Sequence, residues 1–100
     1  MRTIKRTTQF KSDFKRLLRE KARRKFPEFY EEFESLIQKL ADDCPLEEKY
    51  ADHALTGNWR GYRDCHIRPD LVLIYRYDSE ETLELLVLAR IGSHSELRLS

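Results

Sequence analysis

The sequence predicts an α+β fold in which a helical hairpin packs on one face of an antiparallel sheet, in the order β-α-α-β-β-β. Apolar residues recur at helical spacing in the first half of the chain. The second half instead contains three apolar segments of strand length, separated by short turns. A length of 100 residues suits one hydrophobic core, so residues 1–100 are predicted to form a single domain.

The first half of the chain predicts one short strand and two amphipathic helices. Residues 2–7 contain Thr, Ile and Thr and fit an edge strand. A helix is predicted over residues 9–24 and a second over residues 27–42, where Pro27 suits the first helical turn. The side chains expected to pack against the sheet are Phe14, Leu17, Phe33, Ile37 and Leu40.

The second half predicts three strands, over residues 59–67, 71–77 and 82–91. Pro69-Asp70 and residues 78–81 have the composition of turns, and Gly92-Ser93 ends the last strand. Consecutive strands joined by short turns favour an antiparallel meander, with both helices on one of its faces.

Composition excludes several classes of protein. The hydrophobic share of 40% and charged share of 37% indicate a folded chain with a heavily charged surface. No apolar run approaches the roughly 20 residues of a membrane helix, and the N-terminus lacks the apolar core of a secretory signal. Two cysteines do not make a disulfide framework. We therefore expect a cytoplasmic protein with reduced thiols and no membrane partner.

The net charge of +1 conceals a segregated pattern. Residues 1–26 contain 11 basic and 2 acidic side chains, whereas residues 27–56 contain 9 acidic and 2 basic ones. This asymmetry predicts a basic surface that meets a polyanion. Two helices of opposite charge attracting each other would give the same pattern, and charge alone leaves both interpretations open.

Three histidines, His53, His66 and His94, lie near the ends of predicted elements in the half of the chain that also contains Asp70 and Arg90. A lone histidine is usually a surface or capping residue, but histidine is also the side chain best suited to move protons near neutral pH. Three histidines can instead bind zinc. Their spacings of 13 and 28 residues match no metal motif, so we expect no metal or other cofactor. Only 3 glycines are present and no phosphate-binding loop.

Aromatic and basic residues alternate in the segment Trp59-Arg60-Gly61-Tyr62-Arg63. Arginine suits RNA phosphates and aromatic rings suit base stacking. In a strand, alternate residues face opposite sides, and one side must pack on the helices, so a structural role for Trp59 and Tyr62 stays open. The candidate RNA contacts are Trp59, Tyr62, Arg63 and Arg68.

Several separated motifs occur together in one order. They are Asp52-His53-Ala54-Leu55, the segment from Gly57 to Asp64, His66, Pro69-Asp70, Ile74-Tyr75 and Arg90-Ile91-Gly92-Ser93-His94. This combination closely resembles the YafQ branch of the RelE superfamily, the toxins of bacterial type II toxin–antitoxin systems. The resemblance covers residues 52–94 with specific motifs, and residues 1–51 only as a basic helical hairpin of matching size. It implies a RelE-like, microbial ribonuclease-type fold.

The resemblance also implies an activity and partners. Members of this superfamily are endoribonucleases that cut mRNA on the 70S ribosome without metal, by attack of a ribose 2′-hydroxyl on the adjacent phosphate. They are held inactive by a cognate antitoxin, here expected to be of the ribbon-helix-helix type. Two departures, Leu71 where a tryptophan is expected and Arg98 near an expected aromatic, affect base preference more than the reaction.

By similarity, the catalytic group is His53, His66, Asp70, Arg90 and His94. Arg90 would contact phosphate, with Arg63 as a second candidate for that role. We expect His94 to be the principal proton-transfer residue and Asp70 to orient a histidine, while the assignment of acid and base stays open. Two alternatives remain: an RNA- or ribosome-binding module that kept the fold without catalysis, and a structural interaction partner whose histidines are surface residues.

Overall fold

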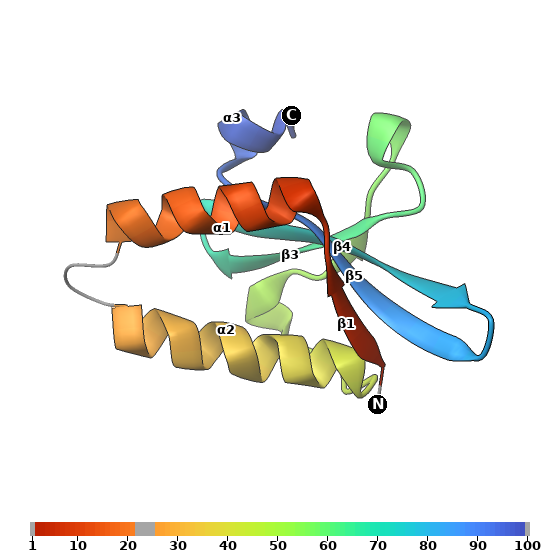
Figure 1. Cartoon of the computed structure of the whole chain (residues 1–100). Coiled ribbons are helices and arrows are strands. Elements are labelled where there is room, and N and C mark those ends of the chain that lie inside the picture. The colour runs from red at the N-terminus through yellow and green to blue at the C-terminus, as the bar shows by residue number, and fades with distance from the viewer. Residues whose placement is uncertain (1, 22–25, 100) are drawn as a thin grey trace.

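A five-stranded sheet and two long helices make up most of the molecule (Figure 1). The structure is a computed structural model and describes residues 2–21 and 26–99. Along the chain the strands are β1 (Thr3–Arg6), β2 (His53–Ala54), β3 (Arg63–Arg68), β4 (Leu71–Glu80) and β5 (Leu83–Gly92). The helices are α1 (Thr8–Lys21), α2 (Phe26–Ala41) and α3 (His94–Leu97), with 3-10 turns η1 (Glu48–Tyr50) and η2 (Gly57–Trp59).

The sheet has the strand order β1-β5-β4-β3-β2 and is mixed. Strands β3, β4 and β5 form the predicted antiparallel meander. The prediction of a wholly antiparallel sheet is wrong for β1, which pairs with β5 in parallel. No tight turn joins β1 to β5, so hairpin geometry does not fix its direction. The short strand β2 and helix α3 were not predicted.

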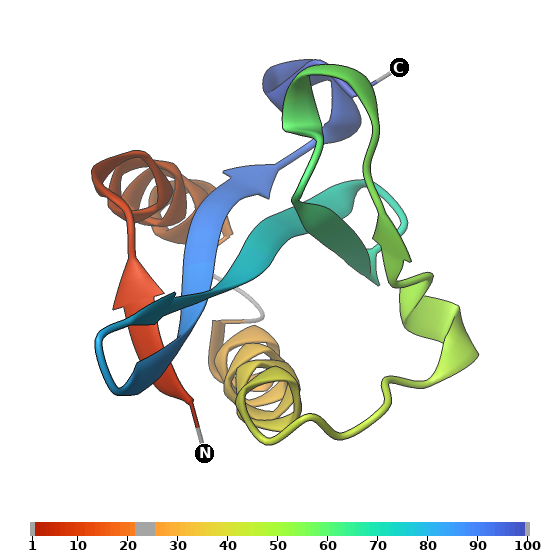
Figure 2. The same ribbon diagram turned by 90° about the vertical axis from the view of Figure 1, so that its right-hand side faces the viewer.

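The predicted strand over residues 59–67 is wrong in its first part. Residues 57–59 form the η2 turn, and β3 begins only at Arg63. Gly57 and Gly61 have φ values of 65° and 93°, in the left-handed region that favours glycine. The chain turns back on itself in this loop, so Trp59 lies in η2 and not in the strand (Figure 2).

One face of the sheet packs against both long helices, as predicted. From the helices, Leu17, Phe33, Ile37 and Leu40 are buried there, which confirms four of the five predicted core residues, whereas Phe14 is only half-buried. The sheet contributes Cys65, Ile67, Leu71, Leu73, Tyr75, Leu86, Leu88 and Ile91. The last predicted residues of the first helix, 22–24, lie outside the described residues.

The opposite face of the sheet has its own smaller cluster. Val72, Ile74 and Ala89 pack with Leu97 of α3, and the rings of Trp59 and Tyr62 lie against them. Those two rings meet edge to face with centroids 5.1 Å apart. The chain thus buries both faces of its central strands, and the η2 turn and α3 lie on the side away from α2 (Figures 1 and 2).

A β-bulge in β5 changes the register near the end of the strand. Ile74 pairs with Arg90 while Tyr75 pairs with Leu88, so Ala89 is an extra residue. Thr7 connects this bulge to α1: its hydroxyl donates to the Ala89 carbonyl oxygen at 2.8 Å and accepts the Phe10 N–H at 3.0 Å. The first turn of α1 is therefore attached to the bulge. Among the described helices, none is long and apolar enough to span a membrane.

The central strand can be tested with a pair of leucine substitutions. Leu73 is fully buried between the sheet and the helices, whereas Leu83 is 53% exposed. We expect Leu73→Ala to lower the free energy of unfolding by about 2–5 kcal/mol, through lost burial and a cavity. Leu83→Ala, the matched control, is expected to change it by less than about 0.5 kcal/mol. Urea denaturation measures both; equal losses would contradict this description of the core.

Candidate active site

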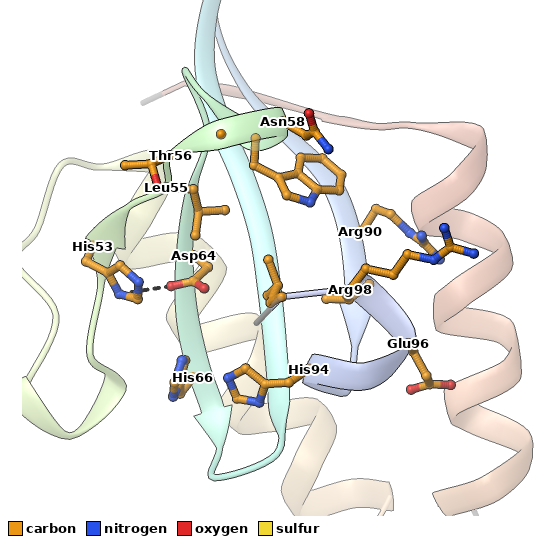
Figure 3. A pocket seen from close by; sticks show the side chains of 14 residues that line it. His53, Leu55, Thr56, Asn58, Asp64, His66, Arg90, His94, Glu96 and Arg98 are labelled. Carbon is orange, nitrogen blue, oxygen red and sulfur yellow. Dashed lines mark ion pairs between the residues drawn. The ribbon is translucent and has the colours of Figure 1, made fainter.

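An open pocket lies on the sheet face opposite the long helices (Figure 3). The β2–η2 segment, strands β3 and β5, and the α3 segment all contribute to it. The residues that line it are His53, Leu55, Thr56, Gly57, Asn58, Trp59, Asp64, His66, Arg90, His94, Glu96, Leu97, Arg98 and Leu99. Four of the five residues assigned to catalysis by resemblance thus line one pocket, and the fifth, Asp70, contacts His94.

The alternation of β3 places two of these side chains. Cys65 and Ile67 point into the helix-side core, so Asp64 and His66 face the other way, opposite Ile74 and Val72 of β4. His66 therefore reaches the pocket, whereas Asp64 is only 3% exposed at its floor.

His53 is held from two sides by oxygen atoms. Its Nδ1 lies 2.8 Å from the carbonyl oxygen of Ala51 and 3.0 Å from Oδ1 of Asp64. Both neighbours are acceptors, so this nitrogen carries the proton and Nε2 is left for another partner. The contact with Asp64 is an ion-pair distance without hydrogen-bond geometry, and Oδ1 of Asp64 has no hydrogen bond within the described part of the chain.

Burial raises the pKa of Asp64, while the nearby His53, His66 and His94 act in the opposite direction. The net shift is upward, because the carboxylate is almost fully removed from water. Its ionised form is thus stabilised only in part, by the histidines in front of it.

His94 is oriented by a second carboxylate. Oδ1 of Asp70 lies 3.1 Å from Nδ1 of His94 and accepts the backbone N–H of the same residue at 3.3 Å. These hydrogen bonds from His94 lower the pKa of Asp70. A capping box between Ser93 and Glu96 fixes the start of α3, so the backbone that carries His94 is also held.

The three histidine rings form a continuous row. Ring centroids lie 6.2 Å apart for His53 and His66 and 5.0 Å apart for His66 and His94, both edge to face. Figure 3 shows His66 between the other two rings. Three imidazole rings, each a group that can both donate and accept a proton, therefore lie within reach of one small substrate group.

Arg90 contributes the cationic side of the pocket. Its Nε and Nη2 donate to the two oxygens of Asp13 on α1, at 2.9 and 2.8 Å, and the Ile91 N–H donates to the same carboxylate at 3.2 Å. Asp13 is 1% exposed. These hydrogen bonds raise the pKa of Arg90, so its positive charge is fixed.

Of the four candidate RNA contacts, the two aromatic residues lie at or beside the pocket and the two arginines lie outside it. Trp59 lines the pocket, and Tyr62 packs beside it under Arg76. Arg63 instead donates to Asp52 at 3.2 Å, and Arg68 pairs with Glu32 of α2. Neither arginine is among the lining residues of the pocket.

Two carboxylates that contact the predicted site residues, Asp13 and Asp64, are not among the residues assigned to the site from the sequence. Asp13 lies in the helical stripe of Phe10, Phe14 and Leu17, and an acidic residue inside an apolar stripe was a usable signal. Asp64 shares the strand face of His66, but its burial depends on the Trp59–Tyr62 turn above the sheet.

The described residues contain no group of three or more His, Cys, Asp or Glu side chains arranged to hold a metal ion. Burial raises the pKa of the Cys65 thiol, so this thiol stays protonated in the helix-side core. The pocket presents imidazole rings, which can transfer protons, and an arginine, which can stabilise negative charge.

A small mixed sheet with a helical hairpin on one face is the architecture of YafQ and related RelE-like toxins. Residues 2–99 match the family model described as the bacterial toxin of type II toxin–antitoxin systems, YafQ. The chain belongs to the YafQ toxin family.

Two curated relatives are similar in sequence to this chain over part of their length. A YafQ toxin of Haemophilus influenzae is 49% identical over 63 residues, which are 63% of this chain and 62% of that protein. The mRNA interferase toxin YafQ of Escherichia coli K12 is 43% identical over 58 residues, 58% of this chain and 59% of that one. The aligned stretches thus cover about three-fifths of these relatives.

Solved structures match over nearly the whole chain. A metal-bound toxin from Helicobacter pylori has a TM-score of 0.81 at 36% identity, covering 97% of this chain and 99% of that one. YafQ in the Escherichia coli DinJ–YafQ complex has a TM-score of 0.74 at 33% identity, covering 97% and 98%. The fold is therefore that of the YafQ toxins.

The buried carboxylate allows a test by pH. Because the pKa of Asp64 is raised in the folded state, its ionised form costs stability, and this cost appears as the pH rises through that pKa. We expect Asp64→Asn to unfold at a higher temperature than the parent at pH 8, with a smaller difference at pH 4.

Calorimetry at both pH values measures this difference. The control is Asp78→Asn, an exposed carboxyl whose pKa is lowered by Arg76, so its loss is not expected to stabilise the protein. If Asp64→Asn unfolds at pH 8 at the same temperature as the parent or at a lower one, the conclusion that the pKa of Asp64 is raised in the folded state is wrong.

Proposed function

We propose that this chain is the toxin of a type II toxin–antitoxin pair and acts as an endoribonuclease on mRNA. The observation that carries the proposal is the row of His53, His66 and His94 beside Arg90 in one open pocket. Cleavage by a 2′-hydroxyl needs a base, an acid for the leaving 5′-oxygen and a cation for the crowded phosphate. The pocket contains side chains for all three tasks.

The proposed roles follow from the hydrogen bonds. Asp70 holds Nδ1 of His94, which leaves Nε2 of that ring to exchange a proton with the substrate. His94 is therefore our candidate for the principal proton-transfer residue, with Asp70 orienting it. Arg90 is proposed to hold the phosphate through charge-assisted hydrogen bonds, while His53 and His66 supply the complementary proton transfer.

RNA contact is proposed chiefly for Trp59, whose ring lines the pocket and can stack on a base. Tyr62 would support that ring from below. Arg63 and Arg68, with their present partners Asp52 and Glu32, would contact RNA only outside the pocket.

The proposed setting is the cytoplasm, where the toxin would act on mRNA at the 70S ribosome. A cognate antitoxin of the ribbon-helix-helix type would hold it inactive. The basic first helix supports a contact with ribosomal RNA, because phosphates are bound by clusters of Lys and Arg. The structure of the Escherichia coli DinJ–YafQ complex supports the proposal of an antitoxin partner, because YafQ is bound to DinJ there.

The substitution His94→Ala tests the site. The side chain is 39% exposed, so the variant is expected to fold. If His94 moves a proton in the transition state, cleavage of ribosome-bound mRNA should fall by at least ~100-fold, which corresponds to about 2.7 kcal/mol of barrier.

Thermal unfolding and cleavage are measured on the same preparation. A folded His94→Ala protein that still cuts at more than a tenth of the parent rate would move the principal role to His66. Unchanged RNA binding with no cleavage by the parent protein would favour the non-catalytic binding module instead.

Metal independence is a separate prediction, and it needs a test because the similar toxin from Helicobacter pylori is metal-bound. Imidazole and carboxylate groups can perform both proton transfers, so cleavage is expected to survive EDTA. The measurement is the cleavage rate before and after chelation. Loss of activity that zinc restores would show that the histidines bind a metal instead.

A further inference from the structure

The buried carboxylate of Asp13 on α1 is outside the catalytic set that the motifs indicate, yet it holds the pocket arginine. We propose that Asp13 is a positioning residue that fixes the guanidinium of Arg90 for the scissile phosphate, a role that rests on the proposed function. The two side chains are 77 positions apart in the chain and meet through two parallel hydrogen bonds of 2.9 and 2.8 Å.

The geometry of this pair restricts Arg90 strongly. The two carboxylate oxygens of Asp13 accept hydrogen bonds from Nε and Nη2 of Arg90. This pair of bonds prevents rotation of the guanidinium group. Nη1 and the second hydrogen of Nη2 are the donors that remain for a phosphate. An arginine on an open pocket would otherwise sample many rotamers and lose side-chain entropy on binding.

Asp13 is itself fixed by its surroundings. It is 1% exposed, and the Ile91 N–H donates to it at 3.2 Å. Burial opposes its ionisation, but the hydrogen bonds from Arg90, Ile91 and Gln9 together with the charge of Arg90 outweigh burial, and the pKa of Asp13 is lowered. The carboxylate is therefore charged at neutral pH and cannot turn away from Arg90 without leaving three donors unpaired.

The backbone around Arg90 is held by the same helix. The Ala89 bulge shifts the register of β5 just before Arg90, and the Thr7 hydroxyl binds the Ala89 carbonyl oxygen. A second contact reaches α3: Arg16 lies 3.7 Å from Asp13 and 3.0 Å from Glu96, which caps the helix of His94. One helix thus aligns the cationic and the histidine sides of the pocket.

The test is a double-mutant cycle on the full-length protein, with Asp13→Asn, Arg90→Gln and the double variant. Asp13→Asn keeps the shape of the side chain and removes its charge. We expect it to lower the cleavage rate of ribosome-bound mRNA by about 10- to 100-fold, because a small displacement of a binding group has effects of this size. In the Arg90→Gln background the same change should alter the rate by less than about 2-fold.

If Asp13 has only a structural role, Asp13→Asn should lower the cleavage rate equally in the parent and in the Arg90→Gln variant. Equal losses would overturn the proposal. If Asp13→Asn does not fold, two other variants are used. The double variant Asp13→Asn/Arg90→Gln is neutral, so it leaves no unpaired buried charge. The variant Asp13→Glu keeps the negative charge but displaces the carboxylate. Asp13→Glu with the full parental rate would also refute it. Asp78→Asn is the matched control, since it breaks an exposed Asp–Arg pair away from the pocket.

A second measurement separates this proposal from the proposed function. The Arg90 Nε–H resonance is followed by NMR while an uncleavable 2′-O-methyl RNA is added. In the parent we expect one sharp resonance that shifts on binding, and in Asp13→Asn a resonance broadened or lost by exchange. If the parent shows this behaviour but never cuts RNA, the nuclease function fails and the positioning role remains. An Arg90 resonance identical in both proteins would refute the role itself.

Discussion

The alternation of side chains across the central strands is the constraint on which the rest of this structure depends. Each side chain of β3, β4 and β5 lies on one face of the sheet or the other, because successive side chains leave a strand on opposite sides. Cys65 and Ile67 bury apolar surface against the helices, and this fixes Asp64 and His66 on the opposite face. The core and the candidate active site are therefore two sides of one sheet, and a slip of one residue would exchange them.

The site combines open and buried groups in a way that suits acid–base chemistry. The rings of His53 and His94 are accessible, while the carboxylates beside them differ in burial: Asp64 is almost fully enclosed and Asp70 is exposed. Burial raises the pKa of Asp64, whereas the hydrogen bonds from His94 lower that of Asp70. His53 and His94 therefore lie beside carboxylates of different burial and different pKa direction.

Helix α1 contributes both to the core and to the position of a pocket side chain. Its apolar stripe covers the sheet, and the same stripe contains Asp13, whose carboxylate fixes Arg90 in the pocket. Breaking a buried ion pair is destabilising because one charge is left unpaired. A change in this helix is therefore expected to affect both folding and the geometry of the site, and measurements on folded protein are needed to tell them apart.

The sequence by itself determined the α+β class, the two helices, the three central strands and four of the five core residues, because hydrophobic periodicity is a local property of the chain. The family motifs also indicated the residues that meet in the pocket, although their roles stay predictions. Only the tertiary structure decided the parallel pairing of β1, the η2 turn in place of the first part of a strand, and the partners of Arg63, Arg68 and Arg90. The pairing of β1 and the arginine partners depend on contacts between residues 11 to 82 positions apart, and no local pattern specifies which distant side chain will supply a charge or a hydrogen bond. The η2 turn depends on left-handed backbone at Gly57 and Gly61, which hydrophobic periodicity does not report.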